Sequence, residues 1–320
     1  AREVAQAEVA RQQADGDYQL QLRRRDLAQA LYRTALAQRV VEIGVQDQSW
    51  LDRIVQSLEQ RYRTGASNLA DLLRAQNEQR RRREQTRTEQ SELEHARFVL
   101  NRLLQRPPEA PWPPLNLPPP VGAVPYSPQL ADLAIRQEPR LRVLQEEIRE
   151  AQAAARLARR QRLPQVLVGA QGRSATADGE FRQAEVMLGF TFPWGNARKY
   201  RADFERERER ARAAEADASD RTLGVREEVH QLTVEIDAAR REALLYRDEI
   251  VPRARQALEA SETTWAANRS SFLEVMDLRR VLLESQLTEA RGLANQHDRL
   301  SELALLCGLD DVKALSRVDA

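Results

Sequence analysis

The chain has 320 residues, of which 42% are hydrophobic, 31% charged and only 5% aromatic, a mixture typical of long helices rather than of one compact globule. Its 50 basic and 49 acidic residues leave a net charge of +1, which gives no electrostatic reason for a nucleic-acid partner. One cysteine excludes an internal disulfide framework, and no apolar run approaches the roughly 18 residues of a membrane helix.

The first part of the chain, residues 1–106, contains no proline and supports helices of about 60 residues. Its apolar residues recur at steps of three and four, which places them on one narrow stripe of each helix. Because the other faces are charged, each helix needs partners in an antiparallel hairpin or a coiled assembly. We therefore interpret residues 1–106 as a long helical hairpin.

A proline-rich connector follows. Ten of the 14 prolines lie between Pro107 and Pro128, so residues 107–127 are predicted to be extended and semi-rigid. Beyond this linker the sequence predicts a helix over residues 128–162, and a second long helical hairpin over residues 196–308 that contains only Pro252. We expect this proline to kink or end a helix. Residues 309–320 form a C-terminal tail.

Between these helices, residues 163–195 contain two runs of alternating apolar residues around a polar middle, which predicts a β-hairpin. Each run is about ten residues long, the length of a membrane-spanning β-strand. A soluble hairpin that caps a coiled coil fits the same pattern. If the hairpin is in a membrane, the residues expected to face lipid are Val166, Val168, Val186, Leu188, Phe190, Phe192 and Trp194.

The two long hairpins are copies of one unit. The stretch RYRTGASNLADLLR, residues 61–74, matches TWAANRSSFLEVMD, residues 264–277, at an offset of 203 positions without any insertion. Each stretch predicts a reversal between helices, with Gly65 or Asn268 in the left-handed conformation that ends the first helix. The candidate N-caps of the returning helices are Ser67 and Asn68 in one copy, and Ser270 and Ser271 in the other.

The offset also bears on the start of the chain, because Ala1 corresponds to Phe204, just past the strand pair of the second copy. The first copy therefore lacks the helix and strands that precede the second. We expect this chain to be a fragment of a precursor with a helix, two more strands and any targeting signal upstream.

The order of elements, the tandem duplication and the segment EIVPRARQALEASETTWAANRSSFLEVMDLRRVLLESQLTEA resemble the outer-membrane efflux family, the TolC-like channel tunnels. The tip pattern of that family is similar to Tyr62, Gly65 and Asp71 in the first copy. Trp265, Asn268 and Glu274 occupy the same positions in the second, where Trp and Asn replace the usual Tyr and Gly.

This resemblance implies a mainly α-helical fold, in which long antiparallel hairpins form an α-barrel tunnel. It also implies a homotrimer in the outer membrane, with the helices extending into the periplasm and four strands per subunit in a twelve-strand transmembrane β-barrel. The implied function is a passive exit duct for drugs or metal ions, partnered by a periplasmic adaptor and an inner-membrane pump of the RND type. The segment EIVPRARQAL is similar to a heavy-metal efflux subgroup.

The resemblance places candidate functional residues at the helical tips. Glu274 and Asp277 fall where family carboxylates ring the periplasmic aperture, and Asp71 is the acid of the first copy, in which Arg74 replaces the second acid. Three copies of such carboxylates in a narrow pore favour cations. Alternatively, these carboxylates serve only as favourable charges at the N-termini of the returning helices. The residues expected to dock the adaptor are Tyr62, Gly65, Asn68, Trp265, Asn268 and Ser271.

The sequence gives little support for an enzyme. His95, His230 and His297 are isolated on helical pattern, and we expect neither a cofactor nor a metal site. Two other classes remain open. A periplasmic adaptor also combines a helical hairpin with β-structure, but its many short strands are missing here. A soluble coiled-coil scaffold explains the composition but not the strand pair.

Overall fold

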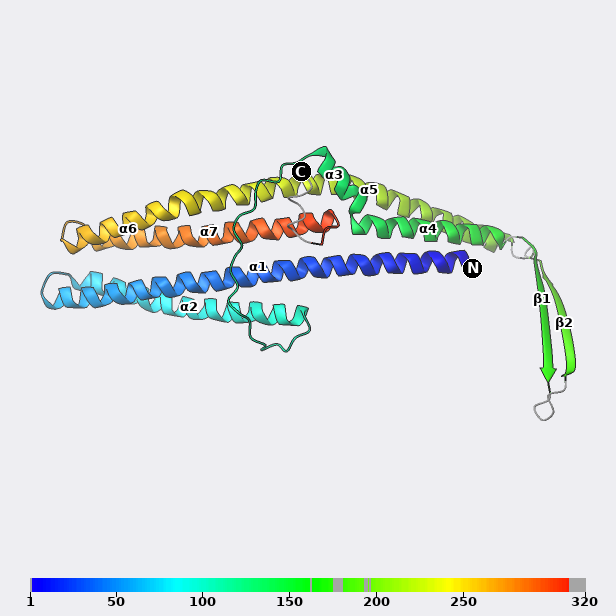
Figure 1. Ribbon diagram of the computed structural model, residues 1–320, viewed down its shortest axis with the longest axis horizontal. Coiled ribbons are helices and arrows are strands. Elements are labelled where there is room, and N and C mark those ends of the chain that lie inside the picture. The colour runs from blue at the N-terminus through cyan, green and yellow to red at the C-terminus, as the bar shows by residue number, and fades with distance from the viewer. Residues whose placement is uncertain (1, 162, 175–180, 193–194, 196, 311–320) are drawn as a thin grey trace. The chain divides into compact units, whose positions relative to one another are not determined.

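The computed structural model describes residues 2–161, 163–174, 181–192, 195 and 197–310 (Figure 1). Trp194, one of the residues expected to face lipid, lies outside these described residues. The chain forms two compact units, one made of residues 1–19 and 137–224, the other of residues 20–136 and 225–320. Two helices, α1 (Arg2–Arg63) and α5 (Ala197–Leu245), contribute to both units.

The larger unit is built from two helical hairpins. In hairpin 1, α1 is followed by α2 (Leu69–Leu103). In hairpin 2, the end of α5 continues through a π-turn, η2 (Tyr246–Ile250), into α6 (Val251–Ala266), and the chain returns as α7 (Phe272–Leu306). Helices α2 and α7 both contain 35 residues, and their first residues, 69 and 272, are 203 positions apart. The predicted duplication is therefore present in the backbone.

The π-turn has its cause in Pro252, which has no backbone N–H to donate to the preceding turn. The N–H of Val251 bonds instead to the carbonyl of Tyr246, five residues back, which is the π-helical pattern. The interruption predicted at this proline is thus a local π-turn through which the helix continues.

Both tips reverse through a residue in the left-handed region, as predicted: φ is 72° at Gly65 and 57° at Asn268. The following backbone N–H groups bond back into the last helical turn at 2.8 Å in each case, from Ala66 to Arg61 and from Arg269 to Thr264. These bonds satisfy carbonyls that the helix end leaves free. The far ends of α2 and α7 repeat the geometry at Gln105 (φ 54°) and Gly308 (φ 61°), again 203 positions apart.

The returning helices begin with matching side-chain caps. Asn68 Oδ1 accepts a hydrogen bond from the Asp71 N–H at 2.8 Å, and Ser271 Oγ accepts one from the Glu274 N–H at 3.3 Å. Of each predicted pair of cap candidates, the second residue is the cap. The acids Asp71 and Glu274 lie in the first turn, where the helix dipole favours a negative charge.

The proline-rich segment 107–127 contains no helix or strand and is tied to both hairpins of the larger unit. At hairpin 1, Trp112 Nε1 donates to Asn101 Oδ1 at 2.7 Å, and the Leu115 N–H donates to Gln38 Oε1 at 3.1 Å. At hairpin 2, the amide of Gln296 pairs with both backbone groups of Val121, at 2.9 and 3.1 Å. The connector is therefore held by specific polar contacts.

The single helix predicted over residues 128–162 is in fact two helices, α3 (Pro128–Gln137) and α4 (Pro139–Arg160). The residue before a proline is disfavoured in the helical region, and Glu138 adopts φ −57° and ψ 120°. Its buried carboxylate then caps α4 by accepting from the Leu141 N–H at 3.0 Å, and it forms an ion pair with Arg221 of α5.

In the smaller unit, β1 (Gln165–Ser174) and β2 (Phe181–Thr191) form an antiparallel pair. Val166 lies opposite Phe190, and Val168 lies opposite Leu188, so the two predicted apolar stripes share one face of the pair. In the part of the chain that the structure describes, no helix combines the length and apolar character needed to cross a membrane.

We expect Gly65→Ala to lower the free energy of unfolding by about 1 kcal/mol, because a side chain is strained at positive φ. Gly16→Ala is the matched control. Gly16 lies inside α1, and an added methyl group would meet no atom within 4 Å apart from its chain neighbours and the adjacent helical backbone, so this change should leave stability equal or raise it by up to about 1 kcal/mol. Denaturant unfolding followed by circular dichroism measures the free energy of unfolding of both variants. Equal changes in the two would contradict the strain expected at position 65.

Candidate functional site

The two helix reversals lie side by side at one end of the larger unit (Figure 1). An open groove of about 700 Å³ separates them. Five of the six predicted docking residues line this groove: Gly65, Asn68, Trp265, Asn268 and Ser271. Fold and duplication thus bring together residues that are 203 positions apart in the sequence.

Arg61, the residue before Tyr62 near the end of α1, joins the tips. Its guanidinium lies 4.8 Å from the ring centroid of Trp265, a cation–π contact. It also donates to the Ala266 carbonyl at 3.1 Å and to the Asn268 side-chain oxygen. Arg61 therefore fixes the left-handed Asn268 of the second tip against the end of α1.

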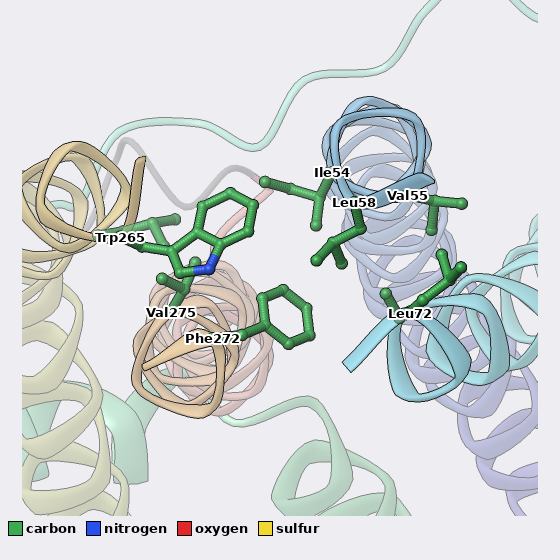
Figure 2. Packing of buried hydrophobic residues seen from close by; sticks show 9 residues of the cluster. Ile54, Val55, Leu58, Leu72, Trp265, Phe272 and Val275 are labelled. Carbon is green, nitrogen blue, oxygen red and sulfur yellow. The ribbon is translucent and has the colours of Figure 1, made fainter. Parts of the chain in front are cut away.

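Beneath the tips, apolar residues from all four helices of the two hairpins form one buried cluster. Figure 2 shows the rings of Trp265 and Phe272 directed toward Ile54 and Leu58 of α1. The two rings are 5.7 Å apart at a tilt of 50°. Burying a large apolar side chain contributes about 1.5–3 kcal/mol. This cluster is therefore a main source of adhesion between the hairpins near their tips.

The equivalent aromatic residues at the two tips have different surroundings. Trp265 is 8% exposed in the cluster, whereas Tyr62, its counterpart in hairpin 1, is 43% exposed. One aromatic supports the contact between the hairpins, and the other faces outward from hairpin 1.

The acids predicted for the aperture also differ between the copies. Asp71 is half-buried, accepts from the Asn68 side chain at 2.9 Å and lies 3.6 Å from Arg74. Glu274 and Asp277 are exposed on α7, and within the described residues no ion pair involves either of them. Two uncompensated carboxylates therefore occupy the first turns of α7, while the carboxylate of α2 is paired.

Farther from the tips, a buried network of ion pairs around Arg279, here named the ion lock, connects the hairpins. Arg279 of α7 donates through Nε and Nη2 to the two carboxylate oxygens of Asp47 at 2.7 and 2.6 Å. Its Nη1 donates to Glu78 Oε1 at 3.0 Å. The guanidinium also lies 5.7 Å from the ring centroid of Trp50. All the donors that face α1 and α2 are therefore satisfied by hairpin 1.

A second arginine extends this lock within hairpin 1. Arg82 is buried and pairs with Glu89 at 2.5 Å and with Asp47 at 3.6 Å. Its guanidinium lies against Gly44 of α1, where an added methyl group would overlap both Arg82 and Glu89. The glycine thus gives α2 the room to place a charged pair against α1.

The ion pairs of the lock shift the pKa values of Arg279 and Glu78. Burial disfavours the charge of Arg279, but the hydrogen bonds to Asp47 and Glu78 outweigh it and raise the pKa of the guanidinium. Burial likewise opposes ionisation of Glu78, yet the hydrogen bonds from Arg279 and Arg81 lower the pKa of this carboxyl. A lowered native pKa means that the stabilisation is present at neutral pH and is lost as the pH falls through that value.

The strand pair presents a different kind of surface. The six described residues expected to face lipid are between 59% and 70% exposed: Val166, Val168, Val186, Leu188, Phe190 and Phe192. On the opposite face glycines oppose larger residues, with Leu167 across from Gly189 and Met187 across from Gly169. One face is therefore continuously apolar and uncovered, which is unusual for a surface in water.

Sequence reasoning did not identify Arg82 or Arg279 as important residues, and it gave Arg61 no role beyond its place in the first candidate docking tip, residues 61–68. They resemble the many other arginines of the helices, and nothing local indicates that two of them are buried. The repeat held one signal, since Arg279 corresponds to Gln76 and so breaks the symmetry of the copies. As for metal binding, no three His, Cys, Asp or Glu side chains are grouped to hold an ion among the residues whose placement is described.

Comparisons with known proteins agree on one family. A family model described as outer membrane efflux protein matches residues 130–309, more than half of the chain. A search of curated protein sequences finds no significant match.

Solved structures give the same fold at low sequence identity. The outer-membrane channel OprN is 20% identical with a TM-score of 0.83, over 96% of this chain and 70% of that one. CusC is 16% identical with a TM-score of 0.81, over 96% and 74%. VceC from Vibrio cholerae is 16% identical with a TM-score of 0.80, over 95% and 74%.

We expect Arg279→Met to lower the free energy of unfolding by about 3–5 kcal/mol, because Asp47 and Glu78 lose the partner of their buried charges. Arg81→Met is the control: Arg81 also pairs with Glu78, at 2.7 Å, but it is exposed, so its loss should cost less than about 1 kcal/mol. Denaturant unfolding measures the free energy of unfolding of both variants. Similar losses would show that the buried ion pairs of Arg279 stabilise the protein no more than an exposed ion pair does.

Proposed function

Because this chain belongs to the outer membrane efflux protein family, we propose that its two helical tips form the docking and gating end of an exit channel. The observation that carries this proposal is the pairing of two duplicated reversals, joined by Arg61, around one open groove. The tips expose polar and charged groups on a rigid support, as a docking end requires.

The family sets the general role. The chain is an outer-membrane channel of a tripartite efflux system, with a periplasmic helical tunnel, and it is not an enzyme. The family is one of trimeric channels. Neither a soluble coiled-coil scaffold nor a periplasmic adaptor accounts for the family match over residues 130–309.

The partner that we propose for the tips is a periplasmic adaptor protein. Gly65, Asn68, Asn268 and Ser271 would supply the contact surface, because they line the groove. Tyr62 does not line the groove, and its exposed ring would contact a neighbouring copy of the chain rather than the adaptor. The buried Trp265 would act from beneath, by holding the second tip on Arg61 and the apolar cluster.

For the aperture, we propose that Glu274 and Asp277 face the axis of the trimer. Both are exposed near the N-terminus of α7, and three copies would place six carboxylates around one opening, which favours cations. Asp71 would lie in the same layer with its charge balanced by Arg74. The alternative role, interaction with the helix dipole alone, predicts no effect on ion selectivity.

In the outer membrane, the strand pair would contribute to the transmembrane β-barrel, with its apolar face toward lipid. Each strand contains ten or eleven residues, enough to cross a bilayer at a tilt. The pump that delivers the substrate would be of the RND type, exporting drugs or metal ions. This assignment rests on the family resemblance, including that of residues 249–258 to a metal-efflux subgroup.

We expect Leu188→Arg to reduce the amount of protein inserted in the outer membrane, because a charge on a lipid-facing strand costs about 2–4 kcal/mol near the bilayer midplane. Gln171→Arg is the control, since Gln171 belongs to the opposite face of the pair. Immunoblots of separated membranes from cells that express the protein compare the variants. Equal insertion of both would contradict the proposed lipid face.

We expect the double change Glu274→Gln and Asp277→Asn to weaken cation selectivity of the channel in planar bilayers by several-fold, since six carboxylates per trimer are removed. Glu92→Gln with Glu94→Gln removes the same charge from an exposed part of α2 far from the tips and should leave the reversal potential unchanged. Unchanged selectivity in both double variants would reject the aperture role and favour the helix-dipole alternative.

A further inference from the structure

The contact between hairpins 1 and 2 within one chain, here named the inner seam, can be mapped onto a second seam through the 203-residue repeat. In the inner seam, α1 presents Trp50 to Glu262 of α6, and Asp47 to Arg279 of α7. If hairpins alternate around a ring, the outer face of hairpin 2 must meet the outer face of hairpin 1 in a neighbouring copy. The residues that meet in this second seam are then the 203-residue counterparts of those that meet in the inner seam.

The outer face of hairpin 1 carries apolar residues that have no cover. Phe272 is 3% exposed in the inner seam, whereas its counterpart Leu69 is 49% exposed. Met276 packs against the buried cluster, whereas its counterpart Leu73 is exposed. Together with Tyr62, the exposed counterpart of Trp265, these residues form a stripe that matches the buried side of the inner seam.

The outer face of hairpin 2 differs from the face that hairpin 1 presents in the inner seam, and the differences match those on the outer face of hairpin 1. The positions of Asp47 and Glu78, which hold Arg279, are occupied by Ile250 and Val281, and Val281 is 47% exposed. Position 76, the counterpart of Arg279, is a glutamine. An uncharged residue thus replaces the arginine where the two acids that would neutralise it are also replaced.

A reciprocal change concerns the pair of Trp50 and Glu262. The counterpart of Trp50 is Arg253, whose exposed side chain contacts only Glu249 among the ion pairs of the described residues, at 3.0 Å. The counterpart of Glu262 is Glu59, half-buried and held by the Gln76 amide at 3.2 Å. A hydrogen bond from an uncharged indole to a carboxylate in the inner seam therefore has two opposite charges at its mapped positions.

We propose that hairpin 2 of one copy covers the Tyr62, Leu69 and Leu73 stripe of a second copy, with Arg253 of the first pairing with Glu59 of the second. Ile250 and Val281 would then lie near Gln76 of the second copy. The proposal rests on the trimeric channel of the proposed function and adds the residues that join its subunits. Charge complementarity and the uncovered apolar stripe both favour a second copy of this chain as the occupant.

Site-directed cross-linking in cell envelopes tests this seam. The variant Arg253→Cys with Glu59→Cys should give covalent dimers and trimers with a short bismaleimide. The matched control, Trp50→Cys with Glu262→Cys, spans the inner seam and should link without an increase in mass. Arg253→Cys with Arg87→Cys should give no link, because Arg87 lies 11 residues beyond Gln76 along α2, about 16 Å at 1.5 Å per residue. The native Cys307 is buried, and burial raises its pKa to about 12, so it competes poorly.

A charge swap gives an independent readout. Arg253→Glu should lower the trimer yield by about tenfold, because three equivalent pairs become repulsive at once. Adding Glu59→Arg should restore it. Trimers that form normally but give no cross-link between positions 59 and 253 would overturn the proposed seam and leave the channel function intact. Complete absence of trimers in the unmodified protein would overturn both.

Discussion

A buried arginine holds the two hairpins of the larger unit in register. Arg279 of α7 reaches two carboxylates of hairpin 1, and its hydrogen bonds are directional, so they are satisfied at one alignment of the helices. The apolar cluster nearer the tips supplies adhesion but would tolerate sliding. Because burying the guanidinium without its partners would be costly, the tips, the groove and Arg61 depend on this lock for their relative positions.

The repeat preserves backbone geometry more strictly than side-chain chemistry. Both tips use a left-handed residue and a side-chain cap, because any tight reversal between long helices must satisfy the same free backbone groups. Side chains at equivalent positions have diverged, as in Trp265 and Tyr62 or Arg279 and Gln76. Two hairpins in identical surroundings would not need this divergence. The divergence is consistent with two seams of different composition, one within the chain and one between copies.

A channel of this family needs no catalytic centre, and its function depends on where charge and apolar surface are exposed. Carboxylates lie uncompensated near the start of α7, while an apolar strand face is left open in the smaller unit. Each feature would be a liability in an isolated soluble protein. Both are explained if lipid covers the strands and a ring of copies surrounds the tips, as we propose.

The sequence by itself determined the helical hairpins, the reversals at Gly65 and Asn268, the strand pair and the family, because these depend on local signals: proline placement, alternation, caps and a repeat without insertions. It missed the break between α3 and α4, although Pro139 is a local signal against helix at Glu138; the burial of that carboxylate against Arg221 was not readable from the sequence. Only the tertiary structure decided which of the many arginines are buried and what they join. The burial of Arg279 depends on partners more than 200 positions away, and no periodicity in one helix records them.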